Sequence, residues 1–186
     1  FDETSFSEAT TEAISQIPGP ARVDLAGSTT SWLEVILDVS NSMWGQIDGR
    51  PKIELAREAL SGALSDLPSN VAVGLRAYGH RVSVEDKEAG CTDTEQLLAP
   101  APGNGPAIIG MAKGLTPRGQ TPIARSLQES ARDMREQGSG GVILLVSDGV
   151  ESCGGDPVAV AAELSASGLD VVLHTVGLGV IAEEAA

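Results

Sequence analysis

The chain has 186 residues, which suits one domain of ordinary size with a full hydrophobic core. Hydrophobic residues make up 41% of it and aromatic residues only 3%, so the core must be built from Val, Leu, Ile and Ala. The formal net charge of −14 argues against a nucleic-acid partner and an anionic membrane surface, because both attract clustered Lys and Arg. No apolar run approaches the roughly 20 residues of a membrane-spanning helix, so direct membrane insertion is not expected.

The first part of the chain differs in composition from the rest. Residues 1–30 are rich in Ser, Thr, Glu, Ala and Gly, contain Pro18 and Pro20, and have no sustained hydrophobic period. We therefore expect a flexible tail or linker over 1–30 and a domain over 31–186.

Apolar runs and helical spacings alternate through this domain. Buried strands are expected where short apolar runs occur, at residues 32–37, 71–78, 142–146 and 171–176. Helices are expected where apolar residues recur at helical spacing, at residues 53–67, 107–113, 122–137 and 157–167. A short run at 95–98 predicts an edge strand that ends before Pro100, and Thr121 is expected to be the N-cap of the helix that starts at Pro122.

Strands separated by helices predict an α/β fold. We expect a doubly wound, mostly parallel central sheet with helices on both faces and one antiparallel edge strand. In such Rossmann-like folds, ligands bind at the carboxyl ends of the strands, near the point where strand order reverses.

Hydroxyl and carboxyl side chains follow the strands at this edge. Asp38, Ser40 and Ser42 come directly after the first strand, Asp148 follows the strand at 142–146, and Thr121 precedes a helix. All five supply oxygen and none supplies nitrogen or sulfur. Hard cations prefer such ligands, so the sequence predicts a site for Mg²⁺, or for Mn²⁺ or Ca²⁺.

Three motifs carry a resemblance to a known family: D-V-S-N-S at 38–42, G-Q-T-P at 119–122 and S-D-G at 147–149. Their combination resembles the metal-ion-dependent adhesion site of von Willebrand factor A domains over about residues 32–180. The stretches "ILDVSNSMWGQIDGR", "LRAYGHR" and "PRGQTPIARSL" are similar to a bacterial, often exported branch, which implies a periplasmic or extracellular location. Measured against that family, the chain is expected to lack the last helix and strand.

The resemblance also implies roles for the site residues. Ser40, Ser42 and Thr121 would bind the metal directly, whereas Asp38 and Asp148 would act mostly through water. A Glu or Asp carboxylate of a protein partner would complete the metal's ligands. The implied function is a metal-dependent protein-binding module for adhesion or assembly, without enzymatic activity.

Other interpretations stay open at this point. Each motif alone is also typical of a turn or a helix cap, so the domain could be structural and bind no ligand. A phosphoryl-transfer enzyme would want a second carboxylate at position 40, where Ser40 stands. A serine hydrolase could use Ser42 and His80, but the sequence lacks the G-x-S-x-G motif that surrounds the nucleophilic serine in many such enzymes.

Four further residues are expected near the site. Cys91 and Cys153 lie in loops at the ligand end of the sheet. They are expected to form a disulfide if the five predicted strands, numbered in chain order, lie in the sheet in the order 3-2-1-4-5. The alternative is two unrelated thiols in a cytosolic protein. Trp44 directly follows the first motif and is either a core residue or a partner-binding residue. His80 is expected in a loop at the rim of the site, where we assign it to partner binding.

Overall fold

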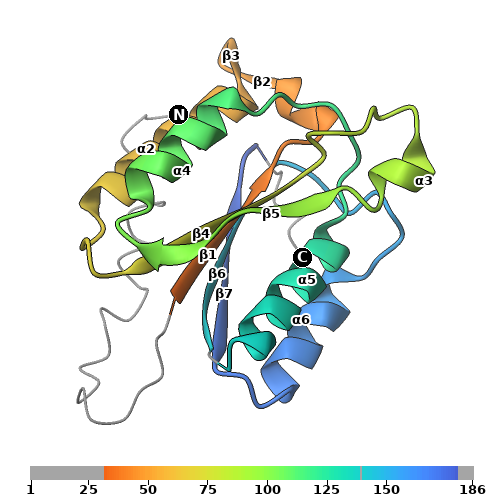
Figure 1. Cartoon of the computed structure of the whole chain (residues 1–186). Helices are drawn as coiled ribbons and strands as arrows, with labels where there is room; N and C mark the ends of the chain where they lie inside the picture. Colours follow the sequence, from red (N-terminus) through yellow and green to blue (C-terminus); the bar gives the residue numbers. More distant parts are fainter. Residues whose placement is uncertain (1–31, 139, 180–186) are drawn as a thin grey trace.

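The computed structural model describes residues 32–138 and 140–179, and their central feature is a five-stranded sheet. The strand order is β5-β4-β1-β6-β7, which is the order expected (Figure 1). All neighbouring pairs are parallel except β4 and β5. The strands are β1 (Trp32–Asp38), β4 (Ala72–Tyr78), β5 (Thr94–Pro102), β6 (Gly141–Ser147) and β7 (Val171–Gly177). The mostly parallel α/β class with one antiparallel edge strand is thus confirmed.

Two expectations fall outside the described residues. One is the tail over residues 1–30, and the other is the end of the chain, which bears on the expected lack of a last helix and strand.

Helices cover both faces of the sheet, as the doubly wound pattern predicts. Figure 1 shows α2 (Lys52–Asp66) and α4 (Gly105–Gly114) side by side on one face, and α5 (Ile123–Glu136) and α6 (Pro157–Ala166) on the other. All seven residues of β1 and of β4 are buried, because these strands are covered on both faces.

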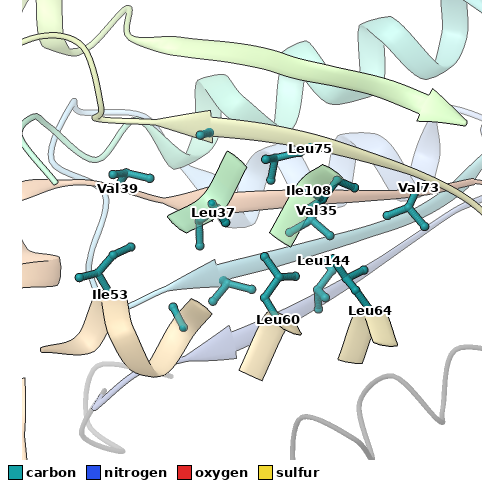
Figure 2. Packing of buried hydrophobic residues seen from close by; sticks show 14 of the residues in the cluster. Val35, Leu37, Val39, Ile53, Leu60, Leu64, Val73, Leu75, Ile108 and Leu144 are labelled. Atoms are coloured by element: carbon teal, nitrogen blue, oxygen red, sulfur yellow. The ribbon is translucent and has the colours of Figure 1, made fainter. Parts of the chain in front are cut away.

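The face below α2 and α4 holds the larger apolar cluster. Val35 and Leu37 of β1 point toward Leu60 of α2 and Ile108 of α4, and all four side chains are at most 3% exposed (Figure 2). Burying each such aliphatic side chain stabilises the fold by about 1.5–3 kcal/mol. This packing holds the start of α2 close to the carboxyl end of β1.

The face below α5 contains a buried ionic cluster that explains why Glu34 interrupts an apolar strand. The Glu34 Oε1 atom lies 3.5 Å from Nε of Arg76 and accepts a 3.3 Å hydrogen bond from Gln96. Arg76 also pairs with Asp133 of α5. Burial raises the pKa of Glu34, and the positive charge of Arg76 offsets this only in part.

The edge strand β5 is longer than expected. It runs through Pro100 to Pro102 instead of ending before Pro100, so that expectation was wrong. The register shifts between the pairs Val73–Ala101 and Leu75–Leu98, which accommodates the proline in a bulge. Gly74 makes the room: a Cβ atom at this position would lie 2.7 Å from Cγ of Pro100.

Short elements fill the loops at the carboxyl ends of the parallel strands. A 3-10 helix, η1 (Asn41–Trp44), follows β1 and leads into the hairpin of β2 (Gln46–Ile47) and β3 (Arg50–Pro51). Asp48 and Gly49 form its turn with φ angles of 50° and 81°, the conformation that Asp-Gly hairpin turns adopt. A short helix, α3 (Lys87–Gly90), lies in the loop between β4 and β5.

Candidate metal centre

Asp38 ends β1 and is held rigidly beneath the candidate site. Its Oδ1 atom accepts a 2.8 Å hydrogen bond from the backbone N–H of Ser40, and its Oδ2 atom accepts a 2.6 Å bond from the Ser147 hydroxyl. Tyr78 donates in turn to the Ser147 hydroxyl at 3.1 Å. Burial raises the pKa of Asp38, while the hydrogen bonds from Ser147 and Ser40 act in the opposite direction.

A chain of side-chain hydrogen bonds joins the loops that follow β1 and β6. The hydroxyls of Ser40 and Ser42 are 2.9 Å apart, and the Ser42 hydroxyl donates to Oδ1 of Asp148 at 2.8 Å. Ser42 therefore contacts both Ser40 and Asp148, although Ser42 and Asp148 are 106 positions apart in the sequence. With the bond from Ser40 to Asp38, hydrogen bonds connect four of the five predicted metal-binding residues.

Thr121 lies at the same place but does not cap a helix. The helix α5 begins at Ile123 with Pro122 as its N-cap and no capping side chain, so the expected role of Thr121 as N-cap was wrong. Glu151 instead accepts a 2.9 Å hydrogen bond from the backbone N–H of Ala124. Within the part of the chain that the structure describes, the Thr121 hydroxyl makes no hydrogen bond, so a ligand could use it.

The loop that carries Thr121 is fixed against the first motif through its backbone. The Asn41 N–H donates to Gly119 O at 3.0 Å, and the Gly119 N–H donates to Gly79 O at 2.8 Å. Gly79 has a φ of +70°, and a Cβ there would lie 2.9 Å from the Ser40 nitrogen. Only glycine allows this approach without strain.

A glycine also leaves space between the side chains of Ser42 and Thr121. A Cβ atom built on Gly149 would lie 3.6 Å from Oγ of Ser42 and 3.9 Å from Cγ2 of Thr121. Gly149 therefore faces the region between these two side chains and leaves it open.

Lys52 is a site residue that the sequence interpretation missed. Its Nζ atom donates to Oδ2 of Asp148 at 2.8 Å, and the Asp148 side chain is fully buried. The Lys52 stem passes close to two glycines: Cβ atoms at Gly45 and Gly179 would lie 3.4 and 3.5 Å from its Cε atom. The only signal in the sequence is the position of Lys52 at the start of α2, directly after the hairpin.

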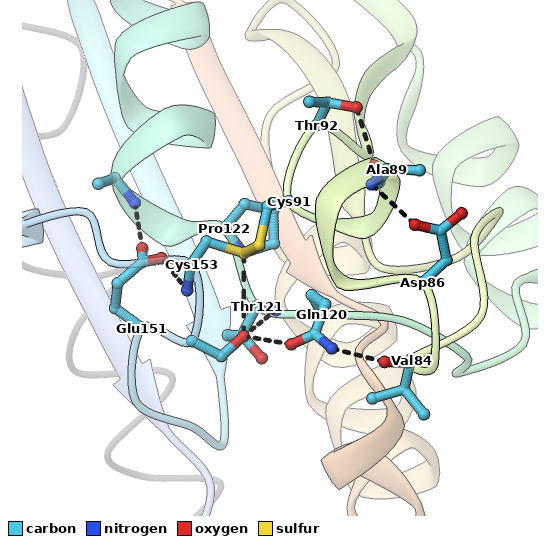
Figure 3. Close-up of a disulfide and its surroundings, with 12 residues drawn as sticks. Val84, Asp86, Ala89, Cys91, Thr92, Gln120, Thr121, Pro122, Glu151 and Cys153 are labelled. Atoms are coloured by element: carbon cyan, nitrogen blue, oxygen red, sulfur yellow. Dashed lines mark hydrogen bonds between the residues drawn. A yellow bond between two sulfur atoms is a disulfide. The ribbon is translucent and has the colours of Figure 1, made fainter.

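The predicted disulfide is present in the structure. Cys91, at the end of α3, is bonded to Cys153, which lies beyond Asp148 (Figure 3). Next to it, the Ser152 hydroxyl accepts a 2.9 Å hydrogen bond from the Thr121 N–H and donates at 2.9 Å to Gln120. The side-chain amide of Gln120 donates a 2.7 Å hydrogen bond from Nε2 to Val84 O. The disulfide thus belongs to a network that holds the Thr121 loop from the side.

The two residues assigned to partner binding have different surroundings. Trp44 is 49% exposed and donates from Nε1 to Pro117 O at 3.0 Å, so it is not a core residue. The His80 side chain is only 8% exposed, and its Nε2 atom lies 3.2 Å from Oε2 of Glu95. Trp44 is therefore accessible at the rim of the site, whereas little of His80 is available to a partner.

The donor set fits a hard cation. The site combines the hydroxyls of Ser40, Ser42 and Thr121 with the two carboxyl groups of Asp38 and Asp148, all of them oxygen ligands. No group of three or more His, Cys, Asp or Glu side chains that could hold a metal occurs among residues 32–138 and 140–179. Metal binding here would therefore depend on the hydroxyls.

Comparisons with known proteins identify relatives and the fold. No protein-family model matches the chain. The chain is 31% identical over 147 residues to the uncharacterized protein YwmD of Bacillus subtilis, covering 77% of this chain and 66% of that protein. It is 30% identical over 141 residues to YwmC, also uncharacterized and from the same organism, covering 74% and 62%. The chain thus spans just under two thirds of the length of these relatives.

Solved structures with the same fold include a von Willebrand factor type A protein from Catenulispora acidiphila (TM-score 0.58, 20% identity, 81% of this chain and 33% of that one). The pilus adhesin SpaC from Lactobacillus rhamnosus GG aligns with a TM-score of 0.61 at 16% identity, covering 81% and 25%. Proximal thread matrix protein 1 of the mussel byssus, solved with zinc in its MIDAS motif, aligns with a TM-score of 0.59 at 16% identity, covering 84% and 38%. The chain therefore has the von Willebrand factor A fold.

Among the residues that the structure describes, no helix is long and apolar enough to cross a membrane.

Proposed function

We propose that the chain is a divalent-metal-dependent protein-binding module that engages a Glu or Asp side chain of a partner. The observation that carries this proposal is the direct contact of Ser40, Ser42 and Asp148, with Thr121 beside them. Side chains from three separate loops converge at the carboxyl end of the sheet, where α/β folds bind their ligands.

The residues of this site have distinct tasks. Ser40, Ser42 and Thr121 present neutral oxygens, so they hold a cation without cancelling its charge. Asp38 and Asp148 keep these groups oriented, because each carboxyl group accepts a hydrogen bond from the loop that it supports. A bound Mg²⁺, Mn²⁺ or Ca²⁺ would supply the positive charge that attracts the partner's carboxylate.

The comparisons support adhesion or assembly as the setting. The solved proteins that share the fold include a pilus adhesin and a mussel-thread matrix protein whose MIDAS motif is occupied by zinc. The Cys91–Cys153 disulfide favours an oxidising compartment, so we place the protein in the periplasm or outside the cell. The domain boundary near residue 31 and a recognition role for Trp44 belong to the same proposal.

A hydrolase built on Ser42 and His80 is disfavoured by the geometry. The Ser42 hydroxyl is bonded to Ser40 and Asp148, and His80 contacts Glu95 instead of a serine. Ser42 and His80 therefore do not form the serine–histidine hydrogen bond that such a hydrolase needs.

The test is calorimetric titration of Mg²⁺ and Mn²⁺ into the parent chain and the Thr121→Ala variant. Because the Thr121 hydroxyl has no role in the fold, the variant should keep its melting temperature and bind metal at least about tenfold more weakly, which corresponds to 1.4 kcal/mol. Thr116→Ala, at an exposed position of the preceding loop, is the matched control and should bind as the parent does. Equal affinities of the parent and Thr121→Ala would refute the site.

The second half of the test concerns the partner. A pull-down from the native cell envelope, with and without chelator, should recover a protein only when metal is present. Changing the responsible Glu or Asp of that protein to the amide should abolish capture.

A further inference from the structure

Lys52 brings a positively charged side chain into the candidate metal site. Its ammonium group is 2.8 Å from Oδ2 of Asp148, while Oδ1 of the same carboxylate accepts from Ser42 at 2.8 Å. The Asp148 side chain is fully buried and that of Lys52 is 19% exposed, so solvent screens this pair only weakly.

The fold keeps this ammonium group in place. The backbone N–H of Lys52 donates to Gly45 O at 2.8 Å, which ties the first residue of α2 to the loop after β1. The absence of side chains at Gly45 and Gly179 leaves room for the end of the Lys52 stem, whose Cε atom would lie 3.4 and 3.5 Å from Cβ atoms at these positions. Lys52 is therefore a built-in part of the site and not a mobile surface residue.

We propose that Lys52 is an internal cation that competes with the divalent metal for Asp148 and so lowers the metal affinity of the site. This inference rests on the proposed metal site and adds a residue that sets its affinity. The site offers two carboxyl groups, Asp38 and Asp148, and the ammonium group already neutralises one of them. A divalent ion must either share the Asp148 carboxylate with Lys52 or displace the Lys52 ammonium group from it.

The expected size of the effect follows from electrostatics. A single and a double positive charge about 6 Å apart repel each other enough to change a binding constant by about tenfold, even with the dielectric constant of water. In a partly buried site the effect is larger. Lys52 would thus keep the metal exchangeable until a partner's carboxylate adds a negative charge.

The test compares Mn²⁺ binding by the whole chain with that of two variants, using calorimetry. Lys52→Gln removes the charge but keeps an amide that can donate to Asp148, and Lys52→Arg keeps the charge. We expect Lys52→Gln to bind Mn²⁺ at least about tenfold more tightly than the parent and Lys52→Arg to stay close to it. Lys113→Gln, at an exposed position in the last turn of α4, controls for the change in overall charge.

The sign of the change decides between two roles. If Lys52 only positioned Asp148, Lys52→Gln would bind Mn²⁺ as the parent does or more weakly, and either result overturns the inference. Melting curves recorded in chelator show whether the variants are folded, and Lys52→Met, which also removes the charge, replaces Lys52→Gln if that variant does not fold. A parent and variants that all fail to bind Mn²⁺ would refute the metal site itself, and the inference with it.

Discussion

The Cys91–Cys153 disulfide joins the loop after β4 to the loop after β6, and the change to test is its removal by the double variant Cys91→Ser/Cys153→Ser. The bond closes a loop of 62 residues. For a loop of this length, the chain-entropy model gives a loss of about 4 kcal/mol in the free energy of unfolding. At about 2–4 °C per kcal/mol for a domain of this size, the melting temperature should fall by about 8–16 °C.

The assay is urea unfolding followed by circular dichroism, in chelator so that metal does not contribute. The parent treated with reductant is the control, because it lacks the bond but keeps both cysteine side chains. Both samples should lose a similar free energy. A loss below about 1 kcal/mol in both would refute the reasoning, since it would mean that the disulfide removes little conformational entropy from the unfolded chain.

Two further variants test other parts of the structure. Because burial raises the pKa of Glu34 above its ordinary value near 4.5, the folded chain holds this proton more tightly than the unfolded chain, and stability is lost as the pH rises through the folded pKa. Glu34→Gln should therefore gain stability relative to the parent in urea unfolding as the pH rises above the ordinary value near 4.5, and a difference that does not change with pH would contradict this. Gly149→Ala should melt within about 2 °C of the parent, because its methyl group makes only ordinary contacts of 3.6 and 3.9 Å with Ser42 and Thr121. It should bind Mg²⁺ at least about tenfold more weakly in calorimetry, with Gly110→Ala in α4 as control, and unchanged binding would mean that the space beside Gly149 is not used.

The sheet could be predicted because its information is local. Short, mostly apolar runs mark β1 and β4, which Glu34 and Arg76 interrupt, and a continuous apolar run marks β6. The placement of Asp38 and Asp148 at strand ends brings them to one edge in any parallel sheet of this order. The site residues therefore come together because of the sheet topology, and the hydrophobic pattern of the sequence is enough to predict that topology.

The parts that could not be predicted depend on contacts between distant segments. Nothing near Lys52 in the sequence indicates that its ammonium group meets Asp148, 96 positions away. The start of α5 was misplaced because Glu151, from another loop, supplies the acceptor that Thr121 was expected to provide. The continuation of β5 through Pro100 likewise depends on a glycine in the neighbouring strand.

The environments of the two tryptophans give the protein a built-in pair of optical reporters. Trp32 is 4% exposed within β1, whereas Trp44 is 49% exposed and bonded to Pro117 O on the loop that leads to Thr121. A charged collisional quencher such as iodide reaches the exposed indole of Trp44 much more readily than the buried indole of Trp32 in the folded chain, so the two emissions can be separated. Emission from Trp44 then follows events at the site, and emission from Trp32 follows the loss of the sheet. One fluorescence titration can thereby distinguish ligand binding from unfolding without any added label.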